Sequence, residues 1–219
     1  MKTGFNSAMM KSMNIWFASG NAHKKTELEA ILGVKLIIPS EAGLEFDPAE
    51  TGNTFHENAL LKARALHRLL CERSPAGYRK GDPVLADDSG LCVDALGGRP
   101  GIYSARYAGP AGEVSGTKLT SPQRYALLLD ELGANQQRSA RFVCAMVLLF
   151  SEDCYYLVQE TLEGEIVKGV DAARGSGGFG YDPVLLIPEL GRTVAELSDE
   201  EKNRISHRGK AGKAIARLL

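Results

Sequence analysis

The chain has 219 residues and a formal net charge of −1 at pH 7, a length that fits one large domain or two tightly joined lobes. Hydrophobic residues make up 44% and charged residues 24%, which is ordinary for a soluble globular protein. The balanced charge argues against a nucleic acid polymer as partner, because such proteins usually carry a basic excess. A small anionic ligand needs only a local positive pocket. No apolar run approaches the length that spans a membrane.

The cysteine and histidine spacings exclude two common kinds of site. None of the four cysteines forms a C-x-x-C pair, which predicts reduced thiols in a cytoplasmic protein. The histidines form no H-E-x-x-H motif, so a zinc site is not expected. Residues 1–12 are mostly polar and lack the apolar centre of a signal peptide. We expect a disordered extension there, and one domain of two lobes over residues 13–219.

Residues 14–18 are expected to form a strand that runs through Ser19 and Gly20 into a helix capped by Asn21. A strand, a tight turn and a helix N-terminus make a natural anion site, because backbone N–H groups and the helix dipole point toward it. Lys24 in the first turn opposes that dipole unless an anion lies nearby. The pattern favours phosphate binding slightly over an ordinary turn with a solvated lysine.

A second strand is expected over residues 34–38, followed by an acidic loop over residues 39–52 that contains Glu50. Residues 54–57 match a capping box that opens a helix. Asn58 and Lys62 are four residues apart on this helix and therefore share a face. Glu50 lies just before the helix, where a loop carboxylate could bind a metal, although most acids in such loops are only solvated.

The apolar run 84–86 predicts a buried strand that ends in Asp87, Asp88, Ser89 and Gly90. Acids at a strand end are costly to desolvate unless a cation or hydrogen-bond donors meet them. A hard-metal or phosphate site and a polar hairpin turn are about equally favoured by these residues alone. Because consecutive side chains of a strand face opposite sides, the two aspartates share a site only if the turn has begun.

The middle of the chain predicts a glycine-rich loop with aromatic residues over 97–108 and a mobile, exposed segment over 109–121. A helix is expected from Pro122 to the glycine at 133. Two β-rich runs, 139–150 and 155–164, predict a long antiparallel hairpin.

Residues 175–180 satisfy G-x-G-x-x-G literally, but no dinucleotide site is expected. That fingerprint needs a helix directly after it, whereas Tyr181, Asp182 and Pro183 lead here into an apolar strand. A flexible glycine loop that holds Phe179, Tyr181 and Asp182 near a ligand is the better interpretation. No P-loop motif occurs.

Near the C-terminus, residues 198–201 match a capping box that opens a short helix with Lys202. Residues 206–209 are expected to break this helix before a final one that runs to residue 219. Lys202, His207 and Arg208 place three potential cations within seven residues. By themselves they favour a solvated basic turn.

Six segments in order resemble the signature blocks of one family, the inosine triphosphate pyrophosphatases, also called Ham1-like proteins. The segments are 19–24, 50–59, 87–91, 98–109, 177–183 and 206–209. The resemblance implies an α/β fold with a long curved mixed β-sheet and helices, and two lobes flanking a central nucleotide cleft. It also implies hydrolysis of ITP, dITP and XTP to the monophosphate and pyrophosphate with Mg²⁺, which removes deaminated purines from the nucleotide pool. A homodimer is the usual assembly.

Matching positions imply the site residues. Glu50 and Asp88 would hold the metal, Asp88 would also accept a proton as the catalytic residue, and Asp87 would support it. The triphosphate would be bound by Ser19, Gly20, Asn21, Ala22, His23, Lys24 and Lys62. The nucleotide pocket would be lined by Ser89, Phe179, Gly180, Tyr181, Asp182, Lys202, His207 and Arg208. His23 stands where many members have glycine, which makes this turn bulkier.

Hydrogen-bond polarity suggests how the base would be chosen. Hypoxanthine and xanthine carry a carbonyl where adenine carries an amine, so donors such as Lys202, His207 or Arg208 would favour the carbonyl. Phe179 could stack on the purine. Two alternatives remain: a nucleotide-binding sensor without catalysis, and a related pyrophosphatase for pyrimidine or modified nucleotides.

Overall fold

The computed structural model describes residues 14–109 and 119–219. The predicted N-terminal extension and most of the predicted mobile segment 109–121 lie outside the described residues. Two compact units make up the described residues: 14–88, 144–160 and 208–219 in unit 1, and 89–109, 119–143 and 161–207 in unit 2. In the part of the chain that is described, no helix is long and apolar enough to cross a membrane.

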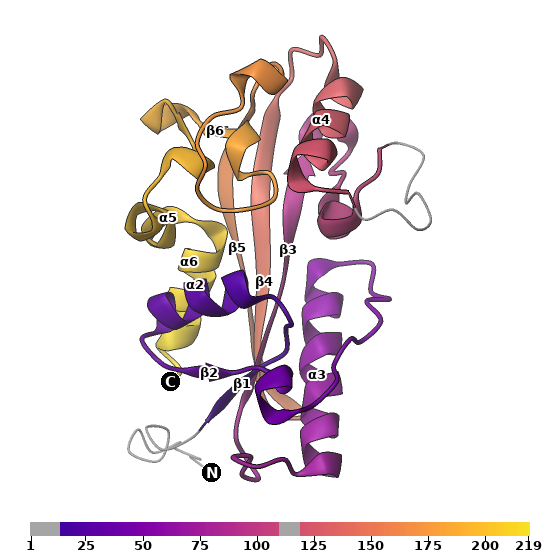
Figure 1. Ribbon diagram of the computed structural model, residues 1–219, viewed down its shortest axis with the longest axis vertical. Helices are drawn as coiled ribbons and strands as arrows, with labels where there is room; N and C mark the ends of the chain where they lie inside the picture. The colour runs from indigo at the N-terminus through magenta and orange to yellow at the C-terminus, as the bar shows by residue number, and fades with distance from the viewer. Residues whose placement is uncertain (1–13, 110–118) are drawn as a thin grey trace. The chain divides into compact units, whose positions relative to one another are not determined.

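A mixed sheet of seven strands has the order β2-β1-β3-β4-β5-β6-β7 (Figure 1). Strand β1 pairs in parallel with both β2 and β3, whereas β6 pairs antiparallel with β5 and β7. The strand bounds are β1 Ile15–Phe17, β2 Leu36–Ile37, β3 Val84–Val93, β4 Ser139–Ser151, β5 Cys154–Ile166, β6 Leu185–Ile187 and β7 Arg192–Thr193. The predicted α/β class with a mixed sheet is confirmed, as is the β4–β5 hairpin. The second strand is shorter than the predicted range 34–38.

The helices are α2 Ala22–Leu32, α3 Phe55–Arg73, α4 Ser121–Leu132, α5 Asp199–Ile205 and α6 His207–Ala216. Each of the first four begins at a side-chain cap, which is Asn21, Thr54, Thr120 and Ser198 in turn. The predicted capping box at Ser198 is confirmed. At Thr54 the hydroxyl accepts from Glu57 N–H at 3.1 Å, but the Glu57 carboxylate accepts from Asn53 one residue earlier.

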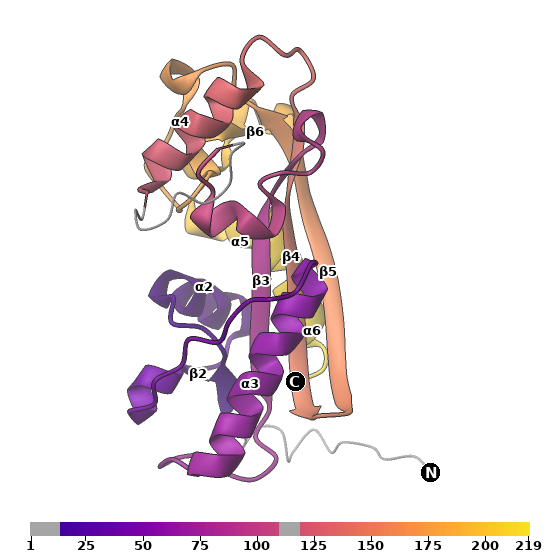
Figure 2. The same ribbon diagram turned by 90° about the vertical axis from the view of Figure 1, so that its right-hand side faces the viewer.

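Unit 1 is layered, with α3 on one face of its strands and α2 and α6 on the other (Figure 1; Figure 2 shows the same ribbon turned by 90°). The period-two alternation of a strand produces both cores. In β3, Val84 and Ala86 pack toward α3, whereas Leu85 packs toward α2 and α6. Leu66 of α3 is fully buried, and truncating such a side chain to alanine costs about 2–5 kcal/mol.

Unit 2 has its own core. Its side chains come from α4 and from those parts of β3, β4 and β5 that belong to this unit. Leu91 and Val93 of β3 are fully buried in it, together with Leu128 of α4. The predicted helix from Pro122 to the glycine at 133 is therefore confirmed. The glycine-rich segment 175–180 leads into a single 3-10 turn, Asp182–Val184, and then β6, which agrees with the prediction that it is no dinucleotide fingerprint.

Two boundary predictions are wrong. Strand β3 does not end at Asp87–Gly90 but continues to Val93, because cations meet both acids and apolar alternation resumes at Leu91. Ser89 and Gly90 therefore lie within a strand and form no turn. Near the C-terminus only Ser206 interrupts the helices, since His207 already begins α6.

Candidate active site

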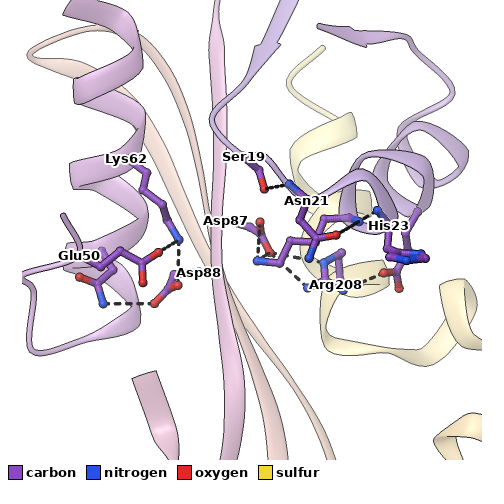
Figure 3. A network of polar contacts seen from close by, with 11 residues as sticks. Ser19, Asn21, His23, Glu50, Lys62, Asp87, Asp88 and Arg208 are labelled. Carbon is purple, nitrogen blue, oxygen red and sulfur yellow. Dashed lines mark hydrogen bonds and ion pairs between the residues drawn. The ribbon is translucent and has the colours of Figure 1, made fainter. Parts of the chain in front are cut away.

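Asp87 and Asp88 point to opposite faces of β3 (Figure 3). Asp88 continues the row of Val84 and Ala86 that faces α3, and Asp87 continues the row of Leu85 that faces α2 and α6. Both carboxylates are buried. Since a buried charge needs compensation, each face must supply its own cations. Unit 1 therefore holds two polar groups, one around each aspartate.

The Asp88 group comprises Glu50, Asn58, Lys62 and Asp88. Lys62 Nζ lies 2.7 Å from Glu50 Oε1 and 2.9 Å from Asp88 Oδ1. Asn58 Nδ2 donates to Asp88 Oδ2 at 3.4 Å. The four-residue spacing on α3 places Asn58 and Lys62 on the same face. As a result, carboxylates from two separate segments, Glu50 and Asp88, converge on one ammonium.

The two titratable groups of this cluster are shifted by their surroundings. Burial raises the pKa of Asp88, and the ammonium of Lys62 opposes that effect only in part, so the pKa stays above its usual range. Burial by itself would lower the pKa of Lys62, but the carboxylates of Asp88, Asp87 and Glu50 raise it overall. A carboxylate of raised pKa is a better proton acceptor, and the lysine beside it keeps its charge.

Asn58 contacts the candidate site, although its shared helix face with Lys62 did not by itself predict a role for it. Its side chain is fully buried, donates to Asp88, and accepts from Gly52 N–H at 2.8 Å. A methyl group at Gly52 would lie 2.7 Å from the Asn58 oxygen. Glycine is therefore required for this close approach. The only signal in the sequence was the four-residue spacing between Asn58 and Lys62.

The Asp87 group comprises Lys24, Glu27, Asp87 and Arg208. Lys24 Nζ lies 3.0 Å from Asp87 Oδ2, and Arg208 donates to that oxygen at 3.3 Å through Nη2. Arg208 also donates to Glu27 Oε2 at 2.8 Å. Burial opposes ionisation of Asp87, but Lys24 and Arg208 more than offset it and hold its pKa well below the usual range.

The turn between β1 and α2 has the predicted cap. Asn21 Oδ1 accepts from the N–H groups of His23 at 3.0 Å and Lys24 at 3.2 Å, and Asn21 N–H donates to Ser19 Oγ at 3.1 Å. The cap therefore meets two of the backbone donors that we expected to be free for an anion. Gly20 is exposed, and beyond its chain neighbours no protein atom lies within 4 Å of the place its methyl group would take. The surface above Gly20 is open to a ligand.

Unit 2 holds a third polar group at Phe179, Asp182 and Lys202. Asp182 Oδ2 accepts from Phe179 N–H at 2.8 Å and from Lys202 Nζ at 3.0 Å. The ammonium also lies 5.0 Å from the centre of the Phe179 ring, within the range of a cation–π contact. Gly178 has a φ of +68°, and a methyl group there would lie 2.0 Å from the Asp182 carboxylate. Glycine is therefore required in this loop.

The other predicted pocket residues of unit 2 have different neighbours. Tyr181 is buried and donates to the Ser104 carbonyl at 3.1 Å. His207 stacks on Phe142 with ring centres 5.0 Å apart. Ser89 is half-buried in β3, and Gly180 lies beside Tyr181 with a φ of +69°.

The basic residues near the C-terminus are not a solvated turn, because Lys202, His207 and Arg208 are all buried. They also belong to different units. Lys202 and His207 belong to unit 2, whereas Arg208 lies in unit 1 against Asp87 and Glu27. Glu27 was missed, because its partner lies 181 residues further along the chain.

Known proteins resemble this chain over nearly all of the residues described above. The sequence model of the Ham1 family matches residues 15–218. The chain belongs to the Ham1 family. Among relatives of this Ham1 chain, a dITP/XTP pyrophosphatase of Treponema denticola is 47% identical over 94% of this chain and 98% of the relative. One of Geobacillus kaustophilus is 46% identical over 90% of this chain and 89% of the relative.

Solved Ham1 structures share the fold. A HAM1 protein from Coxiella burnetii has a TM-score of 0.77 at 37% identity, covering 94% of this chain and 98% of that one. The Ham1 protein of Staphylococcus aureus has a TM-score of 0.76 at 38% identity, covering 94% and 97%.

The Asp88 group of this Ham1 chain fits a magnesium ion. Glu50 and Asp88 offer hard oxygen donors that already converge on one cation, the Lys62 ammonium. Over residues 14–109 and 119–219, no cluster of three or more His, Cys, Asp or Glu could hold a metal. Two carboxylates leave other ligand positions for water and phosphate oxygens, which is how proteins commonly bind Mg²⁺.

Proposed function

We propose that this Ham1 chain hydrolyses ITP, dITP and XTP to the monophosphate and pyrophosphate in a Mg²⁺-dependent reaction, and so removes deaminated purines from the nucleotide pool. The observation that carries the proposal is the convergence of Glu50 and Asp88 on Lys62. This arrangement places oxygen ligands for a hard cation next to the buried Asp88 carboxylate, whose pKa is raised. The named activity of the dITP/XTP pyrophosphatases that it resembles supports the same reaction.

Glu50 and Asp88 would hold the ion. When bound, Mg²⁺ offsets the charge of the phosphate oxygens and stabilises the pyrophosphate leaving group. Asp88 orients the attacking water toward the α-phosphorus and accepts its proton at a carboxylate oxygen. Asn58 holds the second oxygen of Asp88, which fixes the orientation of the carboxylate. Lys62 supplies positive charge beside it.

The segment Ser19–Lys24 would bind the triphosphate. Lys24 offers an ammonium, the start of α2 carries the positive end of the helix dipole, which favours anions, and Gly20 leaves room above the turn. Asp87 supports this part of the site by holding Lys24, while Arg208 and Glu27 hold Asp87 in turn. Arg208 thus acts through carboxylates, and we do not assign it to the base.

A base-recognition group would consist of Ser89, Phe179, Gly180, Tyr181, Asp182, Lys202 and His207. Lys202 and His207 offer donors for the carbonyl of hypoxanthine or xanthine, and Phe179 offers a ring for stacking. Adenine presents an amine at the same position and would leave a buried donor without a partner, which is strongly penalised. Asp182 holds Lys202 in place.

We further propose a homodimer that works in the cytoplasm. The dimer rests on the family resemblance. The cytoplasmic location is supported by the four cysteines, all of which are free thiols, since disulfides mark oxidising compartments.

A substrate panel tests the proposal. Pyrophosphate and orthophosphate are measured separately for ITP, dITP, XTP, the standard NTPs and TTP, with and without MgCl₂. We expect pyrophosphate from the deaminated purines only, and none without the metal. Tight ITP binding without turnover over hours would favour a sensor, and preferential cleavage of pyrimidine or modified nucleotides would favour the other pyrophosphatase class. Asp88→Asn in the same panel separates hydrolysis by this site from contamination.

A further inference from the structure

Ser104 is a buried serine of unit 2 that connects three backbone segments. It lies in the 3-10 helix Gly101–Arg106 and is 7% exposed. Its hydroxyl accepts from Leu91 N–H at 2.8 Å and donates to the Gly101 carbonyl at 2.6 Å. Its own carbonyl accepts from the Tyr181 hydroxyl at 3.1 Å. One residue thus joins β3, its own loop and the glycine loop through Tyr181.

Both distant partners adjoin residues of the base-recognition group. Leu91 is two residues beyond Ser89 on β3, and both its N–H and side chain are buried. Tyr181 stands between Phe179 and Asp182 in the chain, and Asp182 holds both Phe179 N–H and Lys202. The position of Ser104 therefore sets how the Ser89 segment and the Phe179–Asp182 segment are placed relative to each other.

We infer that Ser104 is a positioning residue for base recognition, acting through Leu91 and Tyr181 and not by touching the nucleotide. The inference rests on the proposed function. Ser104 is well suited to the task because its hydroxyl donates and accepts at once, as only a few side chains can. The two hydrogen bonds of this buried hydroxyl fix the backbone at Ser104. They thereby also fix the Ser104 carbonyl, which accepts from the Tyr181 hydroxyl.

Removing the hydroxyl should loosen this connection. Ser104→Ala takes the side-chain acceptor from the buried Leu91 N–H and the donor from Gly101, and groups left unsatisfied in this way are costly. The loop then shifts to find other partners, and the Ser104 carbonyl moves away from Tyr181. Recognition of the base should suffer more than phosphate chemistry, because Asp88, Glu50 and Lys62 belong to unit 1.

The test compares Ser104→Ala, Ser104→Thr and Tyr181→Phe with the wild-type chain, and uses Ser139→Ala as control because Ser139 is an exposed serine of unit 2. Pyrophosphate release is measured for dITP and dATP at a temperature where each variant is folded. We expect Ser104→Ala to raise KM for dITP about tenfold with kcat changed less than about threefold. Discrimination between dITP and dATP should fall, and Ser104→Thr should restore most of it.

Tyr181→Phe removes only a hydroxyl and keeps the ring, so it tests the same connection even if Ser104→Ala fails to fold. We expect its discrimination to fall as well, and the double variant to lose less than the sum of the two single losses, as coupled residues do. Equal losses of kcat/KM for dITP and dATP, or wild-type discrimination in Tyr181→Phe, would overturn the inference. If the wild-type chain releases no pyrophosphate from dITP, the proposed function itself fails.

Discussion

Asp87 and Asp88 are consecutive in the chain, yet their carboxylates bind different lysines. Asp87 lies 3.0 Å from Lys24 and Asp88 lies 2.9 Å from Lys62, on opposite faces of β3. Their surroundings also shift them in opposite directions, with the pKa of Asp87 lowered and that of Asp88 raised. The same strand thus carries Asp87, whose charge stabilises the fold, and Asp88, whose charge is disfavoured by burial.

The first prediction contrasts the two aspartates. A lowered pKa means that the ionised form of Asp87 favours the folded state, and this contribution is present above the unfolded pKa and lost as the pH falls. Asp87→Asn leaves the buried Arg208 with less compensation, so we expect the free energy of unfolding to drop by about 3–5 kcal/mol. Urea unfolding at pH 7 measures it.

Asp88→Asn should cost less stability. Burial disfavours the charge of Asp88, and the Lys62 ammonium keeps Glu50 as a partner, so we expect a smaller drop in the free energy of unfolding than in Asp87→Asn. Pyrophosphate release should fall by about 10²–10⁴-fold with the proton acceptor removed. A larger loss of stability in Asp88→Asn than in Asp87→Asn would contradict the assignment of the two roles.

A second prediction concerns the open surface above Gly20. A methyl group meets no protein atom there beyond the chain neighbours, so Gly20→Ala should change the free energy of unfolding by less than about 0.5 kcal/mol. If phosphates approach this turn, KM for ITP should rise. Gly178→Ala is the matched comparison, because its methyl group would lie 2.0 Å from Asp182 at a φ of +68° and should destabilise the fold. Unchanged KM in Gly20→Ala would remove this turn from the binding site.

A third prediction concerns the metal and is read from stability. Lys62→Met removes the cation on which Glu50 and Asp88 converge, so two carboxylates repel each other across a buried site. We expect a lower Tm in EDTA than wild type, and a larger rise in Tm on adding MgCl₂, since a ligand that binds only the folded state stabilises it. Differential scanning calorimetry with CaCl₂ and KCl as comparison salts checks it. A Tm that is indifferent to MgCl₂ in both proteins would argue against the site.

The fourth prediction uses the helix that carries Lys202. The guanidinium of Arg192 and the N–H of Ser198 lower the pKa of Glu201 to about 2, well below its usual range. A depressed pKa gives stability above the unfolded pKa that is lost as the pH falls through the folded one. Wild type should therefore be more stable than Glu201→Gln at pH 7, and the difference should shrink between pH 4.5 and pH 2. Glu201 is only half-buried, so added salt should also reduce this difference, whereas Glu200→Gln, at the exposed neighbour, should show no such pattern.

Local signals were enough to predict most helices. Asn21 and Ser198 cap helices where the sequence placed them. These features depend on residues a few positions apart, so hydrogen-bond chemistry and periodicity decide them.

The end of β3 and the fate of Arg208 could not be read in this way. Whether Asp88 closes a turn or continues a strand depends on Lys62, which is 26 residues away, and Asp87 depends on Arg208, which is 121 residues away. Asp87, Asp88 and Arg208 are stable where they are only because these distant charges meet them. Residues 206–209 by themselves suggest a solvated turn for the same reason.

Side chains of β3 alternate between the two faces of the sheet, so the number of residues in the strand decides which face each aspartate takes. One residue inserted or deleted between Val84 and Asp87 would rotate every later side chain to the other face of the sheet. Asp88 would then point toward α2 and α6, and Asp87 (after an insertion) or Ser89 (after a deletion) would take its place facing Lys62. The connection from residue 74 to residue 83, which lies before the strand, can vary in length without this penalty. Natural variation in chain length should therefore accumulate in that connection and be absent from the strand itself.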